Sequence, residues 1–178
     1  MTEAKTLSKK IVFQSRHFRV EEIVVTRDSK QFTKQLIERM PIVLVLPYTA
    51  DGQIYLESQY RDAFERHCIE VIAGHIDPDE DPLAAAKREL AEETGLTAAS
   101  WKKVASLELS TNMRAPIHIF FATDITEGKA DLQDDEVIEL LKMPLTEALE
   151  KITSGEIFAT SHITTLLLFD KMKREGKL

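Results

Sequence analysis

The chain has 178 residues, of which 43% are hydrophobic and 30% are charged. These proportions are typical of a single globular protein and exclude a fibrous or largely disordered chain. The formal net charge of -7 disfavours a nucleic-acid-binding surface, because such surfaces use Lys and Arg to neutralise phosphates.

No targeting or membrane-spanning segment is predicted. The first ten residues are polar with no apolar run behind them, so no signal peptide is expected. No segment reaches the ~18 apolar residues of a membrane span, which predicts a cytoplasmic protein.

The N-terminal half of the chain is predicted to form strands. Alternating and β-branched runs predict them at 18–26, 32–38, 42–47, 54–60 and 69–73.

A helix with distinct ends is predicted over 82–94. Asp81 is a suitable N-cap, and Pro82 fits the first helical position, where its missing N–H costs nothing. Gly95 can adopt the left-handed conformation that ends a helix. The helix should therefore begin and end at these residues.

The C-terminal half predicts further strands, then two helices. The strands are expected at 104–109, 117–125 and 137–142, with a loop over 110–116, and the helices at 145–153 and 160–174. Strands and helices do not alternate regularly. We therefore expect an α+β fold, a mixed β-sheet sandwiched between helices, with an antiparallel strand region at the N-terminus.

Three glutamates share one face of the predicted helix. Glu89, Glu92 and Glu93 are spaced i, i+3 and i+4, and they lie at the helix end where the dipole disfavours negative charge. Like charges at this spacing cost a few tenths of a kcal/mol per pair. A bound divalent cation would compensate this repulsion, since Mg²⁺ prefers oxygen ligands. A solvated Glu-rich face is the alternative that the helix alone leaves open.

The spacing around this helix is specific. Every fixed position of the Nudix box occurs in order: Gly74, Glu80, Arg88, Glu89, Leu90, Glu92, Glu93, Gly95 and Leu96. From average residue frequencies, a chance match in this chain is on the order of one in 10⁸. The chain therefore resembles the Nudix hydrolase superfamily, which implies that superfamily's fold and Mg²⁺-dependent cleavage of a pyrophosphate.

The resemblance implies a metal site. Its ligands would be Glu89 and Glu93, with Glu92 beside them and the carbonyl of Ala73, and two or more Mg²⁺ or Mn²⁺ ions are expected. Gly74 would let the backbone approach metal and phosphate.

Two further box residues are expected to support this site. Glu80 and Arg88 would be mainly supporting residues, with Arg88 holding a box carboxylate by a bidentate contact.

Hydrolysis also needs a base or orienting group for water, and two candidates remain open. One is a box glutamate such as Glu92, and Glu93 is also included among the catalytic residues. The other is Glu136 in the acidic run 134–136. Here the chain resembles the ADP-ribose pyrophosphatase group, whose members carry an acidic loop with a catalytic glutamate at this place.

The same group implies substrate contacts upstream of the box. Arg61, in a Gln-Tyr-Arg triplet, would bind substrate phosphates, with a surface salt bridge as the alternative. Glu70 would contact substrate or metal-bound water. The group usually places a proline in the segment 110–116 where this chain has Thr111 and Asn112, which widens the predicted substrates to nucleoside-diphosphate sugars in general.

Three functions therefore compete. The first is hydrolysis of ADP-ribose or a related nucleotide sugar to a nucleoside monophosphate and a sugar phosphate. The second is a nucleoside-triphosphate pyrophosphohydrolase, and the third a nucleotide-sugar sensor without turnover. The resemblance also implies a homodimer, with residues 1–40 as the dimerisation region and 41–178 as the Nudix hydrolase domain. No nucleic-acid or membrane partner is expected.

Overall fold

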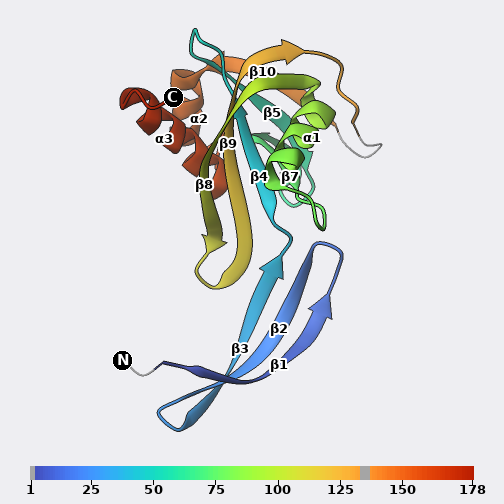
Figure 1. Cartoon of the computed structure of the whole chain (residues 1–178), viewed down its shortest axis with the longest axis vertical. Helices are drawn as coiled ribbons and strands as arrows, with labels where there is room; N and C mark the ends of the chain where they lie inside the picture. The colour runs from blue at the N-terminus through green and yellow to red at the C-terminus, as the bar shows by residue number, and fades with distance from the viewer. Residues whose placement is uncertain (1–2, 133–136) are drawn as a thin grey trace. The chain divides into compact units, whose positions relative to one another are not determined.

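The computed structural model describes residues 3–132 and 137–178 (Figure 1). The strands, in chain order, are β1 (Lys5–Gln14), β2 (Phe18–Arg27), β3 (Lys30–Arg39), β4 (Ile42–Pro47), β5 (Gln53–Arg61), β6 (Arg66–Glu70), β7 (Ile72–His75), β8 (Leu96–Ser110), β9 (Met113–Glu127) and β10 (Ile138–Pro144). The helices are α1 (Pro82–Thr94), α2 (Leu145–Thr153) and α3 (Thr160–Arg174).

The chain divides into two compact units. The first comprises residues 1–41 and 107–117, and the second residues 42–106 and 118–178. In the first unit β1, β2 and β3 form an antiparallel meander, and β3 pairs in parallel with the start of β9 through Ile37 and Met113.

The second unit contains two sheets and the three helices. One sheet has the order β9-β4-β7 with β8 beside β9, and the other has the order β10-β5-β6. Helix α1 packs on β7 and β4, whereas α2 packs on β10 and α3 on β4. In Figure 1, α1 lies on one side of β4 and α3 on the other. The predicted α+β class, with a mixed sheet between helices, is confirmed.

The core lies under α1. Leu90 of the helix is fully buried with Val43, Val45 and Ile72 from the strands and Phe120 from β9. Leu83 packs against the same cluster, so the helix presents an apolar stripe to the sheet and leaves its other faces for charged side chains. Among the described residues, no helix has the length and hydrophobicity that crossing a membrane requires.

Helix bounds follow the prediction more closely than strand bounds do. All three helices begin and end as expected, and the caps of α1 are confirmed. The predicted loop over 110–116 is wrong, because β8 continues to Ser110, β9 begins at Met113, and only a two-residue turn joins them. Pairing with distant segments extends β8 and β9 beyond the apolar runs from which they were predicted. The predictions also missed β1, whose residues are all exposed.

Candidate active site

The helix α1 is held by specific contacts at both ends. The Asp81 side chain accepts hydrogen bonds from the N–H groups of Leu83 (2.9 Å) and Ala84 (3.2 Å). Gly95 has φ 71° and its N–H donates to the carbonyl of Ala91. These caps fix where the helix stops, and thereby where its glutamates lie relative to β7.

Gly74 makes room for Glu89. A Cβ atom at position 74 would lie 1.8 Å from Cδ of Glu89 and 2.1 Å from its Oε1. Only a residue without a side chain allows the carboxylate of α1 to rest against β7 at this point. Glu89 is buried, at 8% exposure, so this close approach brings a charged group into the protein interior.

Arg88 links three carboxylates. Its Nε and Nη2 donate to the two oxygens of Glu80, at 3.0 and 2.9 Å. Its Nη1 donates to Glu89 at 2.8 Å and to Glu92 at 3.1 Å, and Nη2 also reaches the carbonyl of His75. These contacts raise the pKa of Arg88, and the arginine lowers the pKa of Glu80. Arg88 therefore positions the box carboxylates and partly neutralises them.

A second group of carboxylates lies on β5 and β6. Glu57 of β5 lies opposite Glu70 of β6 in the strand register, and the Glu93 carboxyl of α1 interacts with Glu57. Glu57 is completely buried, and no hydrogen-bond donor among the described residues reaches either of its oxygens. Burial raises the pKa of the Glu57 carboxyl well above its usual range, and the charges of Glu93 and Glu70 raise it further.

Glu70 is fixed by two partners. Arg61 binds it in a bidentate ion pair, with Nε–Oε1 and Nη2–Oε2 distances of 2.9 and 2.6 Å. His162 of α3 lies 3.5 Å from Oε2 of Glu70, and its Nδ1 accepts the N–H of Val71 at 3.0 Å. Burial lowers the pKa of His162, which favours a neutral ring. Helix α3 therefore holds the segment that leads into Gly74.

The structure brings most of the predicted site residues together and adds two. The helix glutamates, Arg88, Glu80 and Gly74 form one group, and Ala73 lies beside it in β7, opposite Leu44 of β4. The other predicted pair, Arg61 and Glu70, bind each other. Glu136 lies outside the described residues. The predictions missed Glu57 and His162, since a glutamate in a strand and a histidine in a helix carry no motif. The signal in the sequence is the apolar run 54–56 directly before Glu57, which indicates a buried strand.

The charge of this site suits a divalent cation. Within the described part of the chain, six carboxyl groups interact with Arg61 or Arg88; they are Glu57, Glu70, Glu80, Glu89, Glu92 and Glu93. Excess carboxylates at a partly buried site are stabilised by a cation with oxygen ligands. No three acidic, His or Cys side chains within 3–132 and 137–178 already form a metal-binding group. The structure thus contains candidate ligands without a closed coordination shell.

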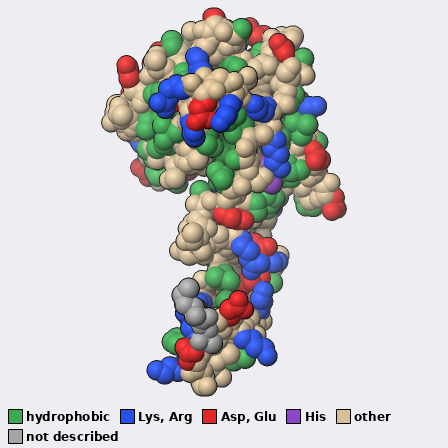
Figure 2. Space-filling view, turned by 60° about the vertical axis from the view of Figure 1, so that its left-hand side comes forward, with side chains coloured by type: hydrophobic (Ala, Val, Ile, Leu, Met, Phe, Trp, Pro, Cys, Tyr) green, Lys and Arg blue, Asp and Glu red, His purple; other side chains and the backbone are tan. Residues whose placement is uncertain are grey.

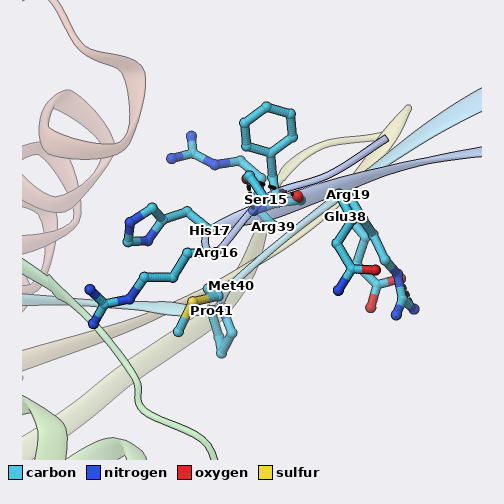
Figure 3. A pocket seen from close by; sticks show the side chains of 10 residues that line it. Ser15, Arg16, His17, Arg19, Glu38, Arg39, Met40 and Pro41 are labelled. Atoms are coloured by element: carbon cyan, nitrogen blue, oxygen red, sulfur yellow. Dashed lines mark hydrogen bonds and ion pairs between the residues drawn. The ribbon is translucent and has the colours of Figure 1, made fainter. Parts of the chain in front are cut away.

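Two cavities are lined by other residues. One, of about 280 Å³, lies in the first unit and is lined by residues 14–19 and 38–41. In Figure 3, the side chains of Arg16 and His17 extend to one side of it, and Arg19 lies with Glu38 on the other. The second cavity is lined by residues of β10, α2 and α3 and by the turn at Gly52. Neither cavity is lined by a box carboxylate. The candidate active site is therefore located by the clustered carboxylates and not by the size of a cavity.

Family membership follows from comparison with known proteins. A sequence model of the NUDIX domain matches residues 38–160, which is more than half of the chain. Together with the carboxylate-bearing helix, this match shows that the chain belongs to the Nudix family. It is an enzyme of the Nudix pyrophosphatase class, a hydrolase.

Two curated relatives and one solved structure are similar over most of the chain. The ADP-ribose pyrophosphatase of Bacillus subtilis is 31% identical over 161 residues, covering 88% of this chain and 86% of that protein. The GDP-mannose pyrophosphatase of Citrobacter koseri is 31% identical over 173 residues, covering 88% and 90%. A crystal structure of an ADP compounds hydrolase matches with a TM-score of 0.87 at 21% identity, covering 100% and 98% of the two chains. This last match shows the fold.

Proposed function

We propose that this enzyme carries out Mg²⁺-dependent hydrolysis of the pyrophosphate bond of ADP-ribose or a related nucleoside-diphosphate sugar. The products would be a nucleoside monophosphate and a sugar phosphate. The observation that carries the proposal is the buried carboxylate of Glu89 against Gly74, in a site with more carboxyl groups than arginines. Buried carboxylates in such excess are costly unless a cation binds them.

The metal ligands we propose are Glu89, Glu93 and the carbonyl of Ala73, with Glu92 beside them. Glu92 is suited to an outer position, because its side chain is 42% exposed whereas that of Glu89 is 11% exposed. Two or more Mg²⁺ or Mn²⁺ ions, when bound, would neutralise phosphate oxygens and lower the pKa of a bound water.

The supporting roles follow from the contacts of Arg88. Its Nη1 donates to Glu89 and Glu92. Its Nε and Nη2 are held by Glu80, and Nη2 also by the His75 carbonyl. This network orients the carboxylates before any ion arrives, which reduces the ordering that metal binding requires.

Substrate binding is proposed for Arg61, Glu70 and Gly74. The Arg61 side chain is 37% exposed although it pairs with buried Glu70. Contact with Glu70 raises the pKa of Arg61, so its charge is retained where a substrate phosphate would approach. A guanidinium that is oriented by one carboxylate and still partly exposed can bind phosphate with its remaining N–H groups.

Glu136 and Glu92 are the proposed candidates for the general base, with Glu93 included among the catalytic residues. Two contacts on either side of Glu136 support its candidacy. The N–H of Asp131 donates to the carbonyl of Glu92 in α1, and Ile138 pairs with Gln59 of β5. Both ends of the intervening segment are thus tied to elements that carry the site carboxylates.

The named relatives support a nucleotide sugar over the alternatives. Two relatives at 31% identity are named for ADP-ribose and for GDP-mannose. A triphosphate pyrophosphohydrolase and a sensor without turnover remain the competing functions. The complete set of box glutamates argues against the sensor, because a binding module does not need all of them.

A substrate panel tests this proposal. Purified protein with Mg²⁺ is given ADP-ribose, GDP-mannose and nucleoside triphosphates, and the nucleoside monophosphate that hydrolysis forms is measured by ion-exchange chromatography. Turnover should be fastest with a nucleotide sugar. Preference for triphosphates would support the second function, and tight binding of nucleotide sugars without turnover would support the sensor.

Glu93→Gln provides the site-specific arm of the same assay. This isosteric change removes a metal ligand, so turnover should fall about 100-fold or more while the far-ultraviolet circular dichroism stays unchanged. Glu150→Gln, which removes one charge from the exposed face of α2, is the matched control and should keep full activity. A Glu93→Gln enzyme with near wild-type turnover would contradict the assignment.

We also propose that the protein is a homodimer that acts in the cytoplasm. The first unit supports the dimer, since seven large hydrophobic side chains of β1–β3 are at least about one-third exposed: Leu7, Ile11, Val12, Phe13, Phe18, Phe32 and Ile37. On the face drawn in Figure 2, hydrophobic side chains of this unit lie among Lys, Arg, Asp and Glu side chains. Exposed apolar surface with charged neighbours is typical of protein interfaces.

A further inference from the structure

Glu57 is a fully buried acidic group in the neighbourhood of other acidic groups. Its exposed fraction is 0%, and neither of its carboxylate oxygens has a hydrogen-bond partner among residues 3–132 and 137–178. Removing a carboxyl group from water without compensating contacts is costly, so buried acidic groups in proteins are normally paired or bind a metal. Glu57 lies outside the Nudix box, in the central strand of the β10-β5-β6 sheet.

The surroundings of Glu57 are acidic. Glu57 lies opposite Glu70 in the register of β5 and β6, and side chains opposite each other project from the same face. Glu93 of α1 interacts with Glu57 as well. Arg61 is close enough to attract all three carboxyls, but two of its side-chain nitrogens are used in the ion pair with Glu70. Like charges opposite each other in a sheet are destabilising, so a cation or a proton between Glu57 and Glu93 would stabilise this arrangement.

We propose that Glu57 is a further carboxylate ligand of the divalent-metal site, and that it holds a Mg²⁺ or Mn²⁺ ion jointly with Glu93. The inference rests on the proposed function and adds to it a residue from β5 that the box motif does not contain. One or two protein carboxylates are a common ligand set for Mg²⁺, which fills its other positions with water and substrate oxygens. The competing occupant is a proton shared by the two carboxyls.

Metal binding without substrate distinguishes the cation from the proton. The free Mn²⁺ concentration is followed by electron paramagnetic resonance during titration of the wild type, Glu57→Gln, Glu93→Gln and Glu150→Gln. Glutamine keeps the size of the side chain and removes its charge. Glu57→Gln should raise the Kd of at least one Mn²⁺ site tenfold or more, whereas Glu150→Gln should bind Mn²⁺ as the wild type does. Equal Mn²⁺ isotherms for Glu57→Gln and the wild type would overturn the proposal.

The other arms separate this inference from the proposed function. If Glu93→Gln weakens Mn²⁺ binding and Glu57→Gln does not, only the role of Glu57 fails. If the wild type binds no Mn²⁺, the metal site fails and both proposals are overturned.

A second variant covers the case in which the buried amide of Glu57→Gln prevents folding. Glu57→Leu removes the buried charge with little change in side-chain volume at a fully buried position, and leaves no polar atom there that needs a partner. The rise in Tm that saturating Mn²⁺ causes in the wild type should be much smaller in Glu57→Leu. A full Tm rise in that variant would overturn the proposal.

Discussion

Two arginines and one histidine organise the site at the residue scale. Arg88 holds the carboxylates of α1, whereas Arg61 and His162 hold Glu70. Arg88 belongs to α1, Arg61 to β5 and His162 to α3. The carboxylates are thus held by side chains from three different elements. Such contacts around the ligands set the geometry that metal and substrate encounter.

His162 makes the stability of the fold depend on pH. Burial lowers the pKa of His162 from its ordinary value near 6.5, so the folded state binds a proton less readily than the unfolded state. The stabilisation by neutral His162 is therefore complete above pH 6.5 and is lost as pH falls through the folded-state pKa. One proton changes the free energy of unfolding by at most about 1.4 kcal/mol per pH unit.

Chemical denaturation at a series of pH values below 6.5 measures this dependence. The wild type should lose stability more steeply with falling pH than His162→Gln, which has no proton to bind there. Parallel slopes for the two proteins would show that His162 does not control this pH range.

At the scale of elements, the C-terminal end of α1 packs closely against the backbone of the segment that follows β9. Gly95 has φ 71°, and a Cβ atom there would lie 2.6 Å from backbone atoms of Lys129 and Ala130. Asp131 then donates its N–H to the carbonyl of Glu92. The segment after β9 thus satisfies a carbonyl at the C-terminal end of the helix, and the helix end and this segment support each other.

Gly95→Ala should destabilise the protein. The left-handed conformation costs an alanine about 1–2 kcal/mol, and the close backbone adds about 1–3 kcal/mol of overpacking. The free energy of unfolding, from urea titration, should therefore fall by about 3 kcal/mol.

Gly155→Ala is the matched control for this change. Gly155 also has a positive φ, of 81°, but among the described residues no atom beyond its chain neighbours lies within 4 Å of the place that a Cβ atom would take there. It should lose only the conformational cost, about 1–2 kcal/mol. Equal losses in the two alanine variants would mean that the backbone at 129–130 yields without cost.

At the scale of the whole molecule, the first unit differs from the second in how it uses apolar residues. The second unit buries its large side chains under α1 and α3, as Leu90 and Phe169 show, whereas β1 exposes every one of its residues. The buried hydrophobic residues of β1–β3 are Ile23 and Val25, so the described part of the meander has little core of its own. Association with a second copy would bury the exposed side chains.

Light scattering measures the predicted assembly. The wild type should have twice the mass of one chain at micromolar concentration. Ile11→Glu should be monomeric, because Ile11 is 49% exposed on β1 and a glutamate there would bring a charge into the interface. Glu150→Lys, which changes the charge of an exposed position on α2, should remain dimeric. A monomeric wild type would remove the dimer proposal.

The local sequence determined the features that depend on neighbouring residues. The bounds of α1 follow from Asp81 and Gly95, and the spacing of Glu89 and Glu93 follows from the helical repeat, so both could be predicted without the fold. The box spacing likewise indicated the family. The extended hairpin of β8 and β9 could not be predicted in this way, since strand length depends on pairing with distant segments.

Only the tertiary structure decided which side chains from distant segments meet. Glu57 lies opposite Glu70 because β5 pairs with β6, and Glu93 of α1 interacts with Glu57. His162 likewise reaches Val71 across 91 residues of sequence. None of these contacts leaves a local pattern, because each depends on strand register and helix packing. The sequence thus determined the carboxylate helix, and the fold determined the charge environment in which it acts.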